Sequence, residues 1–126
     1  MNNINRSEVK QLLLQERKDF IIIDVREHDE VMESPLVSLE AQYYVNFPLS
    51  VLRILPEVEI QERLQVWSQK RGLTLKQMRW ILSCRSGGRS SQAQIICSRV
   101  GIETENLTGG LLAWQEEEGK ENEAAR

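Results

Sequence analysis

A run of four apolar residues, Phe20 to Ile23, ends at an aspartate and constrains the fold more than any other segment. Three of the four residues are β-branched, and no polar residue interrupts them. A half-exposed antiparallel strand alternates apolar and polar residues, whereas a parallel strand covered by helices on both faces is continuously apolar. Residues 20–24 therefore predict a buried parallel strand with Asp24 at its carboxyl end.

Similar apolar segments alternate with helical patterns along the rest of the chain. Further strands are predicted at residues 43–47, 78–83 and 104–107, and helices at a segment capped by Ser7 and at residues 50–55, 59–71, 90–99 and 111–118. Residues 26–43 are expected to be irregular, and Gly72 is expected to end the helix before it in the left-handed conformation. The alternation predicts a three-layer α/β fold with a mainly parallel sheet.

The length of the chain is sufficient for one domain. A chain of 126 residues buries roughly two thirds of the surface of its unfolded form, so a single core suffices. We expect one domain over residues 1–118 and a polar, frayed tail over 119–126.

The first residues lack the apolar stretch of a secretory signal, and no apolar run approaches the roughly 18 residues of a membrane helix. Two cysteines are too few for a disulfide framework, and a cytoplasmic protein with no membrane partner is predicted.

The net charge of −3 hides an uneven distribution of charge. Residues 63–102 contain eight lysines or arginines and no acid, whereas acids outnumber bases on both sides. The bases are spread singly among apolar residues, without a compact basic run or the interleaved aromatic residues of single-strand binders. We therefore expect no nucleic-acid partner, and the basic segment predicts a small anionic ligand instead.

The segment from Cys84 to Ser90, named the cysteine loop below, carries the most informative chemistry. The cysteine follows an apolar strand, which places it at the carboxyl edge of the sheet, where open α/β folds bind ligands. Gly87 and Gly88 let backbone N–H groups turn inward, and the helix predicted to begin near Ser90 directs its positive end to the same point. The N–H groups and two arginines favour a thiolate, so we predict a nucleophile that needs no general base and a pKa well below about 8.5.

The remaining metal-binding or nucleophilic side chains are interpreted as structural or solvated. Cys97 lies inside an apolar helix, about 10 Å along its axis from Ser90, which is too far for a disulfide with Cys84 and indicates a packing role. His28 lies in the irregular stretch and is expected to be solvated. Two cysteines and one distant histidine exclude a tetrahedral zinc site, and no metal or cofactor is expected.

Three sequence blocks resemble the single-domain rhodanese-like sulfurtransferases. They are Ile-Asp-Val-Arg-Glu at residues 23–27, the cysteine loop, and Asn-Leu-Thr-Gly-Gly-Leu-Leu-Ala-Trp at residues 106–114. The second and third blocks, about twenty residues apart, make the resemblance specific, and it extends over residues 21–119. It implies the rhodanese-like fold, with a five-stranded, mainly parallel sheet flanked by helices.

The resemblance also implies an activity, that of a thiosulfate sulfurtransferase. In that family the loop cysteine attacks the outer sulfur of thiosulfate or of a persulfide, and carries this sulfur as a persulfide until a thiophilic acceptor removes it. Cys84 is the corresponding nucleophile in this chain. The implied partners are a small anionic sulfur donor and a thiol acceptor, or a thioredoxin-like protein in that role.

The other candidate site residues are assigned by position in the blocks. The N–H groups of the loop residues stabilise the thiolate and persulfide, while two of these residues, Arg85 and Arg89, also attract and orient the anionic donor. The loop residues with this assignment are Arg85, Ser86, Gly87, Gly88, Arg89 and Ser90. Asp24 and Arg26 are assigned supporting roles, and Asp24 is expected to pair with a loop arginine or to cap a neighbouring N–H.

Two alternatives are weighed against sulfur transfer. Cysteine phosphatases and arsenate reductases place five residues between cysteine and arginine, but only four separate Cys84 from Arg89, which favours sulfur chemistry. The Gly-His-Ile-x-Gly-Ala turn usual in rhodanese-like domains is replaced at residues 33–41, where only Ala41 aligns. This departure motivates the second alternative, a non-catalytic binding or regulatory module.

Overall fold

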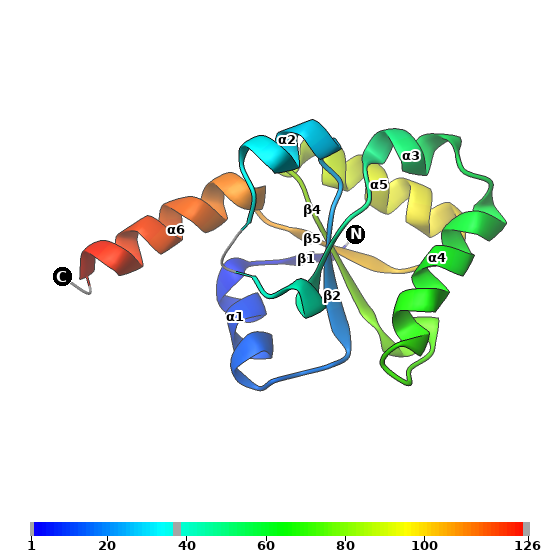
Figure 1. Ribbon diagram of the computed structural model, residues 1–126, viewed down its shortest axis with the longest axis horizontal. Helices are drawn as coiled ribbons and strands as arrows, with labels where there is room; N and C mark the ends of the chain where they lie inside the picture. Colours follow the sequence, from blue (N-terminus) through cyan, green and yellow to red (C-terminus); the bar gives the residue numbers. More distant parts are fainter. Residues whose placement is uncertain (1, 37–38, 125–126) are drawn as a thin grey trace.

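Strands and helices alternate along almost the whole chain in the computed structural model, which describes residues 2–36 and 39–124 (Figure 1). The strands are β1 (Asn2–Ile4), β2 (Phe20–Asp24), β3 (Tyr44–Asn46), β4 (Arg79–Ser83) and β5 (Thr104–Leu107). The helices are α1 (Arg6–Leu14), α2 (His28–Glu33), α3 (Leu49–Ile54), α4 (Glu57–Gln69), α5 (Gly88–Arg99) and α6 (Gly110–Ala124). Short 3-10 turns lie at Ala41–Tyr43 and Leu75–Gln77.

The five strands form one sheet in the order β1-β5-β4-β2-β3, and every pairing in it is parallel. The register of the central pair sets Phe20 beside Arg79 and Asp24 beside Ser83, so β2 and β4 end at the same edge. A parallel sheet with intervening helices is the α/β architecture that the sequence predicts, and the fold class is confirmed. The common edge also places Cys84 beside the end of β2.

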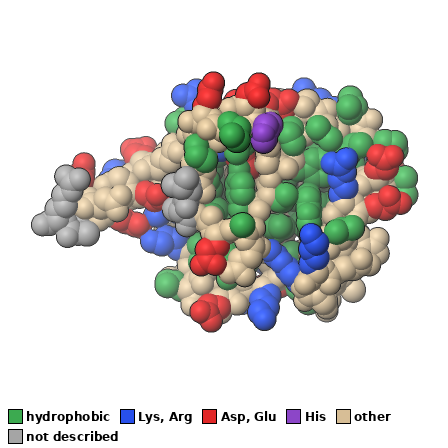
Figure 2. Space-filling model, viewed as in Figure 1, with side chains coloured by type: hydrophobic (Ala, Val, Ile, Leu, Met, Phe, Trp, Pro, Cys, Tyr) green, Lys and Arg blue, Asp and Glu red, His purple; other side chains and the backbone are tan. Residues whose placement is uncertain are grey.

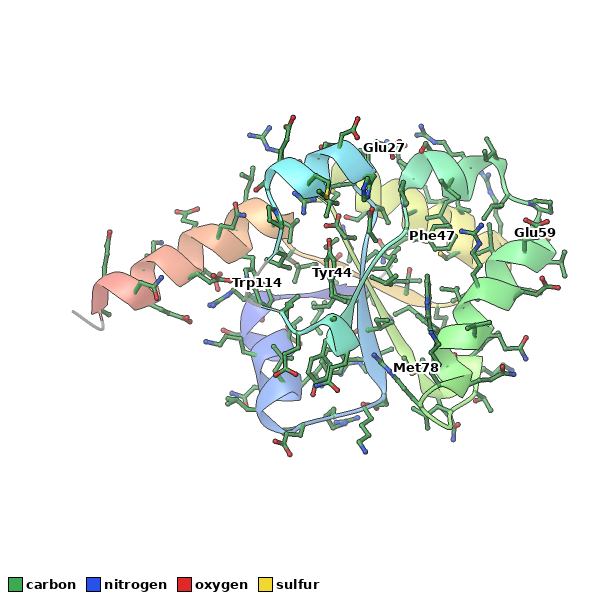
Figure 3. The ribbon with its side chains drawn as sticks, in the orientation of Figure 1. Glu27, Tyr44, Phe47, Glu59, Met78 and Trp114 are labelled. Atoms are coloured by element: carbon green, nitrogen blue, oxygen red, sulfur yellow. The ribbon has the colours of Figure 1, made fainter. Side chains whose placement is uncertain are left out.

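Helices cover both faces of the sheet and divide the apolar core into two clusters. Ile21 and Ile23 belong to the cluster packed against α3, α4 and α5, in which Phe47 meets Trp67 edge to face at 5.8 Å. Phe20 and Ile22 belong to the cluster packed against α1 and α6 (Figures 1 and 3). This confirms the prediction of a strand buried on both faces. None of the helices within residues 2–36 and 39–124 combines the length and apolar content needed to cross a membrane.

The N-terminal segment differs from the prediction in two respects. Residues Asn2–Ile4 form β1, paired with β5, although three residues with two asparagines show no strand pattern. The cap of α1 is Asn5 rather than Ser7: the Asn5 side chain accepts from the N–H of Glu8 at 2.9 Å, and the Glu8 carboxylate accepts from the N–H of Asn5 at 3.2 Å. This reciprocal pair satisfies N–H groups that a helix start leaves open.

The stretch expected to be irregular contains α2, whose N-terminus is closed by a second reciprocal pair between Glu27 and Glu30. The tail expected to fray is helical to Ala124, because α6 continues six residues past the predicted end. The Glu121 carboxylate holds it by accepting from Arg6 at 2.7 Å and from Lys10 at 3.1 Å. The structure does not describe residues 125–126, the last two of that predicted tail. It also does not describe residues 37–38, which lie within the atypical stretch 33–41.

Candidate active site at the cysteine loop

Cys84 follows the last residue of β4 and is buried, with 1% of its surface exposed. The chain then turns through Gly87, which has a left-handed φ of +109° and precedes the first residue of α5. An L-residue seldom adopts this conformation, so glycine is required at position 87. The turn directs the N–H of Gly87 at Cys84 Sγ, at 3.0 Å, and thereby forms the predicted cradle around the sulfur.

The hydroxyl of Ser90 is the second polar group at the sulfur. Ser90 is fully buried in the first turn of α5, and its Oγ lies 3.4 Å from Cys84 Sγ and 3.1 Å from the carbonyl oxygen of Gly87. The side-chain oxygen of Asn106 on β5 is a further acceptor within reach of the single hydroxyl proton of Ser90. The amide nitrogen of Asn106 donates to the carbonyl of Gly87 at 3.3 Å and to Ser91 Oγ at 2.9 Å, and so joins β5 to the loop.

These contacts shift the pKa of the two cysteines in opposite directions. Burial is the largest single influence on Cys84 and raises its pKa, but hydrogen bonds from the Ser90 hydroxyl and from the N–H groups of Ser90, Gly87 and Ser86 together outweigh it. The net pKa of Cys84 lies below its ordinary value, in the direction predicted. Cys97 has burial alone, which raises its pKa to about 11, and it packs in the core as predicted. Both are free thiols.

The start of α6 supports the loop from the other side. The N–H of Leu111 donates to the carbonyl of Cys84 at 2.9 Å, and the N–H of Leu112 donates to the carbonyl of Arg85 at 3.0 Å. Gly110 permits this close approach, because a Cβ at that position would lie 2.5 Å from the Cys84 carbonyl oxygen. The third sequence block is therefore explained as the contact surface of the cysteine loop.

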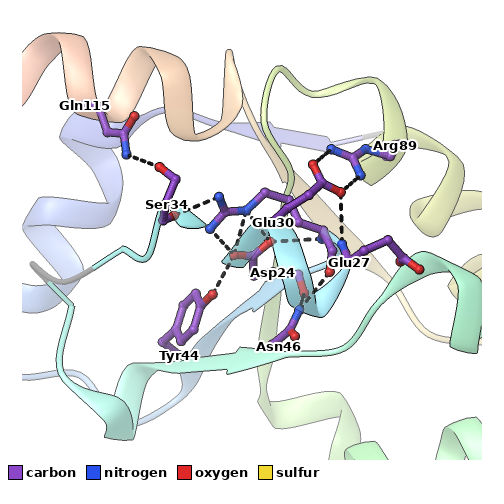
Figure 4. A network of polar contacts seen from close by, with 9 residues as sticks. Asp24, Glu27, Glu30, Ser34, Tyr44, Asn46, Arg89 and Gln115 are labelled. Atoms are coloured by element: carbon purple, nitrogen blue, oxygen red, sulfur yellow. Dashed lines mark hydrogen bonds and ion pairs between the residues drawn. The ribbon is translucent and has the colours of Figure 1, made fainter. Parts of the chain in front are cut away.

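The two loop arginines have different surroundings. Arg85 is exposed, and no ion pair joins it to any residue within the described ranges. Arg89 instead donates to both carboxylate oxygens of Glu30 on α2, at 2.5 and 2.8 Å (Figure 4). The pKa of Glu30 is lowered to about 2, and the hydrogen bonds from Arg89 are the largest cause. The sequence did not indicate that Arg89 has a carboxylate partner.

Asp24 and Arg26 form a buried pair at the end of β2. The Asp24 carboxylate accepts from the Arg26 backbone N–H at 3.0 Å, from its guanidinium at 2.8 Å and from the Tyr44 hydroxyl at 2.5 Å. Of the two alternatives predicted for Asp24, the N–H cap is the one observed, and Arg26 rather than a loop arginine is its ion-pair partner. Arg26 also donates to the Ser34 carbonyl at 2.9 Å, which fixes the ends of the segment containing α2 (Figure 4).

Sequence reasoning missed Glu30, and it gave no separate role to Asn106. A possible signal for Glu30 is its position three residues after Glu27, the spacing of a helix start at this sheet edge. A signal for Asn106 is a polar residue near the carboxyl end of a predicted strand. His28, the only histidine, lies on the surface at the start of α2, which agrees with the solvated role predicted for it (Figure 2).

The fold and the loop together define a class of protein, an α/β domain that presents a buried, hydrogen-bonded cysteine at the carboxyl edge of its sheet. The sequence model of one protein family, the rhodanese-like domain, matches residues 5–117 of the chain. The chain therefore belongs to the rhodanese-like domain family, and the family assignment made from the three blocks is confirmed. No curated protein matches it.

Solved structures agree on the fold. A rhodanese-related protein from Thermoplasma volcanium is 23% identical, with 93% of each chain covered and a TM-score of 0.63. A rhodanese-like domain protein from Staphylococcus aureus is 24% identical, with 90% of this chain and 91% of the other covered and a TM-score of 0.61. An NAD-dependent persulfide reductase from A. fulgidus is 22% identical over 90% of this chain but only 16% of its own length, with a TM-score of 0.54.

Proposed function

We propose that the protein is a sulfurtransferase that carries sulfane sulfur as a persulfide on Cys84. The observation that carries the proposal is the pair of hydrogen-bonding groups at the sulfur, the Gly87 N–H at 3.0 Å and the Ser90 hydroxyl at 3.4 Å. Such donors stabilise a negative charge on sulfur both before and after transfer. A cysteine that served packing alone would have no such donors, as Cys97 illustrates.

The transfer proceeds in two displacements. The Cys84 thiolate attacks the outer sulfur of the donor, and the donor S–S bond breaks. Its electron pair leaves on sulfite when the donor is thiosulfate, or on a thiolate when the donor is a persulfide. A thiolate acceptor then attacks the outer sulfur on Cys84 and restores the Cys84 thiolate. No general base is needed, because the hydrogen bonds at the sulfur lower the pKa of Cys84 and favour its thiolate form.

Sulfur chemistry is favoured over phosphate chemistry by the size of the loop. Four residues separate Cys84 from Arg89, one fewer than in the cysteine phosphatases, and the Arg89 guanidinium is already bound to the Glu30 carboxylate. We propose a cytoplasmic location for the activity, because a thiol nucleophile stays reduced in that compartment. The acceptor belongs to the class of thiols, small or carried on a thioredoxin-like protein.

Mass spectrometry of the intact protein tests the proposal. Exposure to thiosulfate, and separately to a small alkyl persulfide, is expected to add about 32 Da, the mass of one sulfur, to Cys84, and a thiol should remove it. Cys84→Ser should lose the adduct, and Cys97→Ser, the matched control, should retain it. An adduct on Cys97 alone would contradict the mechanism. A reactive Cys84 that transfers sulfur to no thiol acceptor would instead support a rhodanese-like binding or regulatory module.

A further inference from the structure

The ion pair between Arg89 and Glu30 alters the charge at the mouth of the cysteine loop. Its two hydrogen bonds are short and parallel, so the planar guanidinium is engaged along the edge that would otherwise bind two oxygens of an anion. Glu30 is itself held in place, since its Oε1 also accepts from the N–H of Glu27 at 3.2 Å. With a pKa of about 2, the Glu30 carboxylate remains ionised at any working pH.

This carboxylate binds the edge of the Arg89 guanidinium that a sulfonate would otherwise bind. The donor thiosulfate is a dianion whose oxygens match an arginine fork, but Glu30 already binds the fork of Arg89. Glu27, near enough to influence Arg89 electrostatically, adds a further negative charge to the same side. Arg85 is then the one loop guanidinium that the described residues leave without a carboxylate partner.

We infer that Glu30 makes the Cys84 site select persulfide donors over thiosulfate and other small dianions. The inference rests on the proposed function and names its donor class. A persulfide presents its outer sulfur without a sulfonate and needs no second guanidinium. The Cys84 thiolate takes that sulfur together with its hydrogen, the donor S–S bond breaks, and its electron pair leaves on the donor thiolate.

The test compares Glu30→Gln with Asp29→Asn. The first variant removes the charge at Arg89 and keeps the size of the side chain, and the second removes an exposed charge one residue away on α2. Sulfur transfer to a thiol acceptor is measured with thiosulfate and with a small alkyl persulfide. For Glu30→Gln we expect kcat/KM to rise about tenfold with thiosulfate, mainly through KM, and to stay within about twofold with the persulfide. Asp29→Asn should change neither value.

Several outcomes would overturn the inference. One is an equal change with both donors in Glu30→Gln, which would make Glu30 a general support of the loop. Another is the same gain for thiosulfate in Asp29→Asn, which would indicate a diffuse field of charge. If circular dichroism shows that Glu30→Gln is unfolded, the donor preference of the wild-type protein tests the inference instead. The wild-type protein should transfer sulfur at least about tenfold faster from the persulfide than from thiosulfate at equal concentration. Failure of the proposed function gives a distinct result, in which the wild-type Cys84 gains sulfur from neither donor.

Discussion

Replacing Gly110 with alanine tests whether the start of α6 fixes the cysteine loop. Gly110 has a φ of +59°, and an added Cβ would lie 2.5 Å from the carbonyl oxygen of Cys84 and 2.7 Å from that of Arg85. A left-handed L-residue costs roughly 1–2 kcal/mol. Moving the helix away weakens two hydrogen bonds, those from Leu111 and Leu112, at about 1 kcal/mol each. The total, about 3 kcal/mol, is a large part of a typical stability of roughly 5–15 kcal/mol.

Thermal unfolding and alkylation of Cys84 measure the two consequences of Gly110→Ala. For a chain of this length, about 3 kcal/mol lowers Tm by roughly 12 °C. Alkylation at neutral pH should also slow, because a displaced loop no longer aims the Gly87 N–H at the sulfur. Gly119→Ala is the matched control in the same helix: a Cβ there meets nothing within 4 Å, and alanine is the better helix former by up to about 1 kcal/mol. Its Tm should stay the same or rise slightly.

The reasoning would be refuted if Gly110→Ala unfolded within about 2 °C of the wild-type protein and kept the same pH profile of Cys84 alkylation. Such a result would mean that α6 can move away from the loop at little cost. A loss of stability with an unchanged alkylation profile would refute only the prediction that α6 positions the Cys84 sulfur. It would show that α6 stabilises the fold without positioning the sulfur.

Three further predictions concern the same site. Ser90→Ala should raise the pKa of Cys84 and slow its alkylation at pH 7 by roughly threefold to tenfold, as followed by a pH series of iodoacetamide reaction rates. Cys97→Ser should leave that profile unchanged, because the Cys97 thiol is buried and its pKa is raised to about 11. Binding by Arg89 lowers the pKa of Glu30 from 4.5 to about 2, so the stabilisation from this pair is present above pH 4.5 and is lost as pH falls toward 2. The difference in Tm between the wild-type protein and Glu30→Gln should therefore be largest near neutral pH and vanish below pH 2.

The elements that the sequence predicts well are those whose pattern is set by burial. The continuous apolar run of β2 reflects two covered faces, and the glycine after Cys84 reflects a left-handed turn, so both can be inferred locally. The strand β1 has three residues, and its position depends on pairing with β5 at the other end of the chain. No local pattern contains that information.

The end of α6 has the same explanation. Past Glu118 the helix has few apolar residues, and its order depends on Glu121 binding to Arg6 and Lys10 of α1, more than a hundred residues away in sequence. The Arg6 guanidinium also lies over the Trp114 ring at 5.0 Å. Side-chain contacts between distant elements decide where α6 ends, and propensity along the chain does not register them.

The charge of the site shows most clearly why composition does not determine a surface. Residues 63–102 carry eight bases and no acid, which predicts a strongly positive site, yet folding brings acids and other acceptors from outside this segment against several of these bases. The pairs are Arg79 with Glu105, Arg89 with Glu30, Arg71 with the carbonyls of Phe20 and Gln42, and Arg63 with the Phe47 ring. At the cysteine loop this leaves Arg85 as the cation without a carboxylate partner among the described residues. The Cys84 thiolate is favoured by hydrogen bonds at close range, and the charge of Arg89 adds to them although Glu30 binds that guanidinium. On the donor selectivity proposed above, the sulfur donor for such a site is one without a double negative charge.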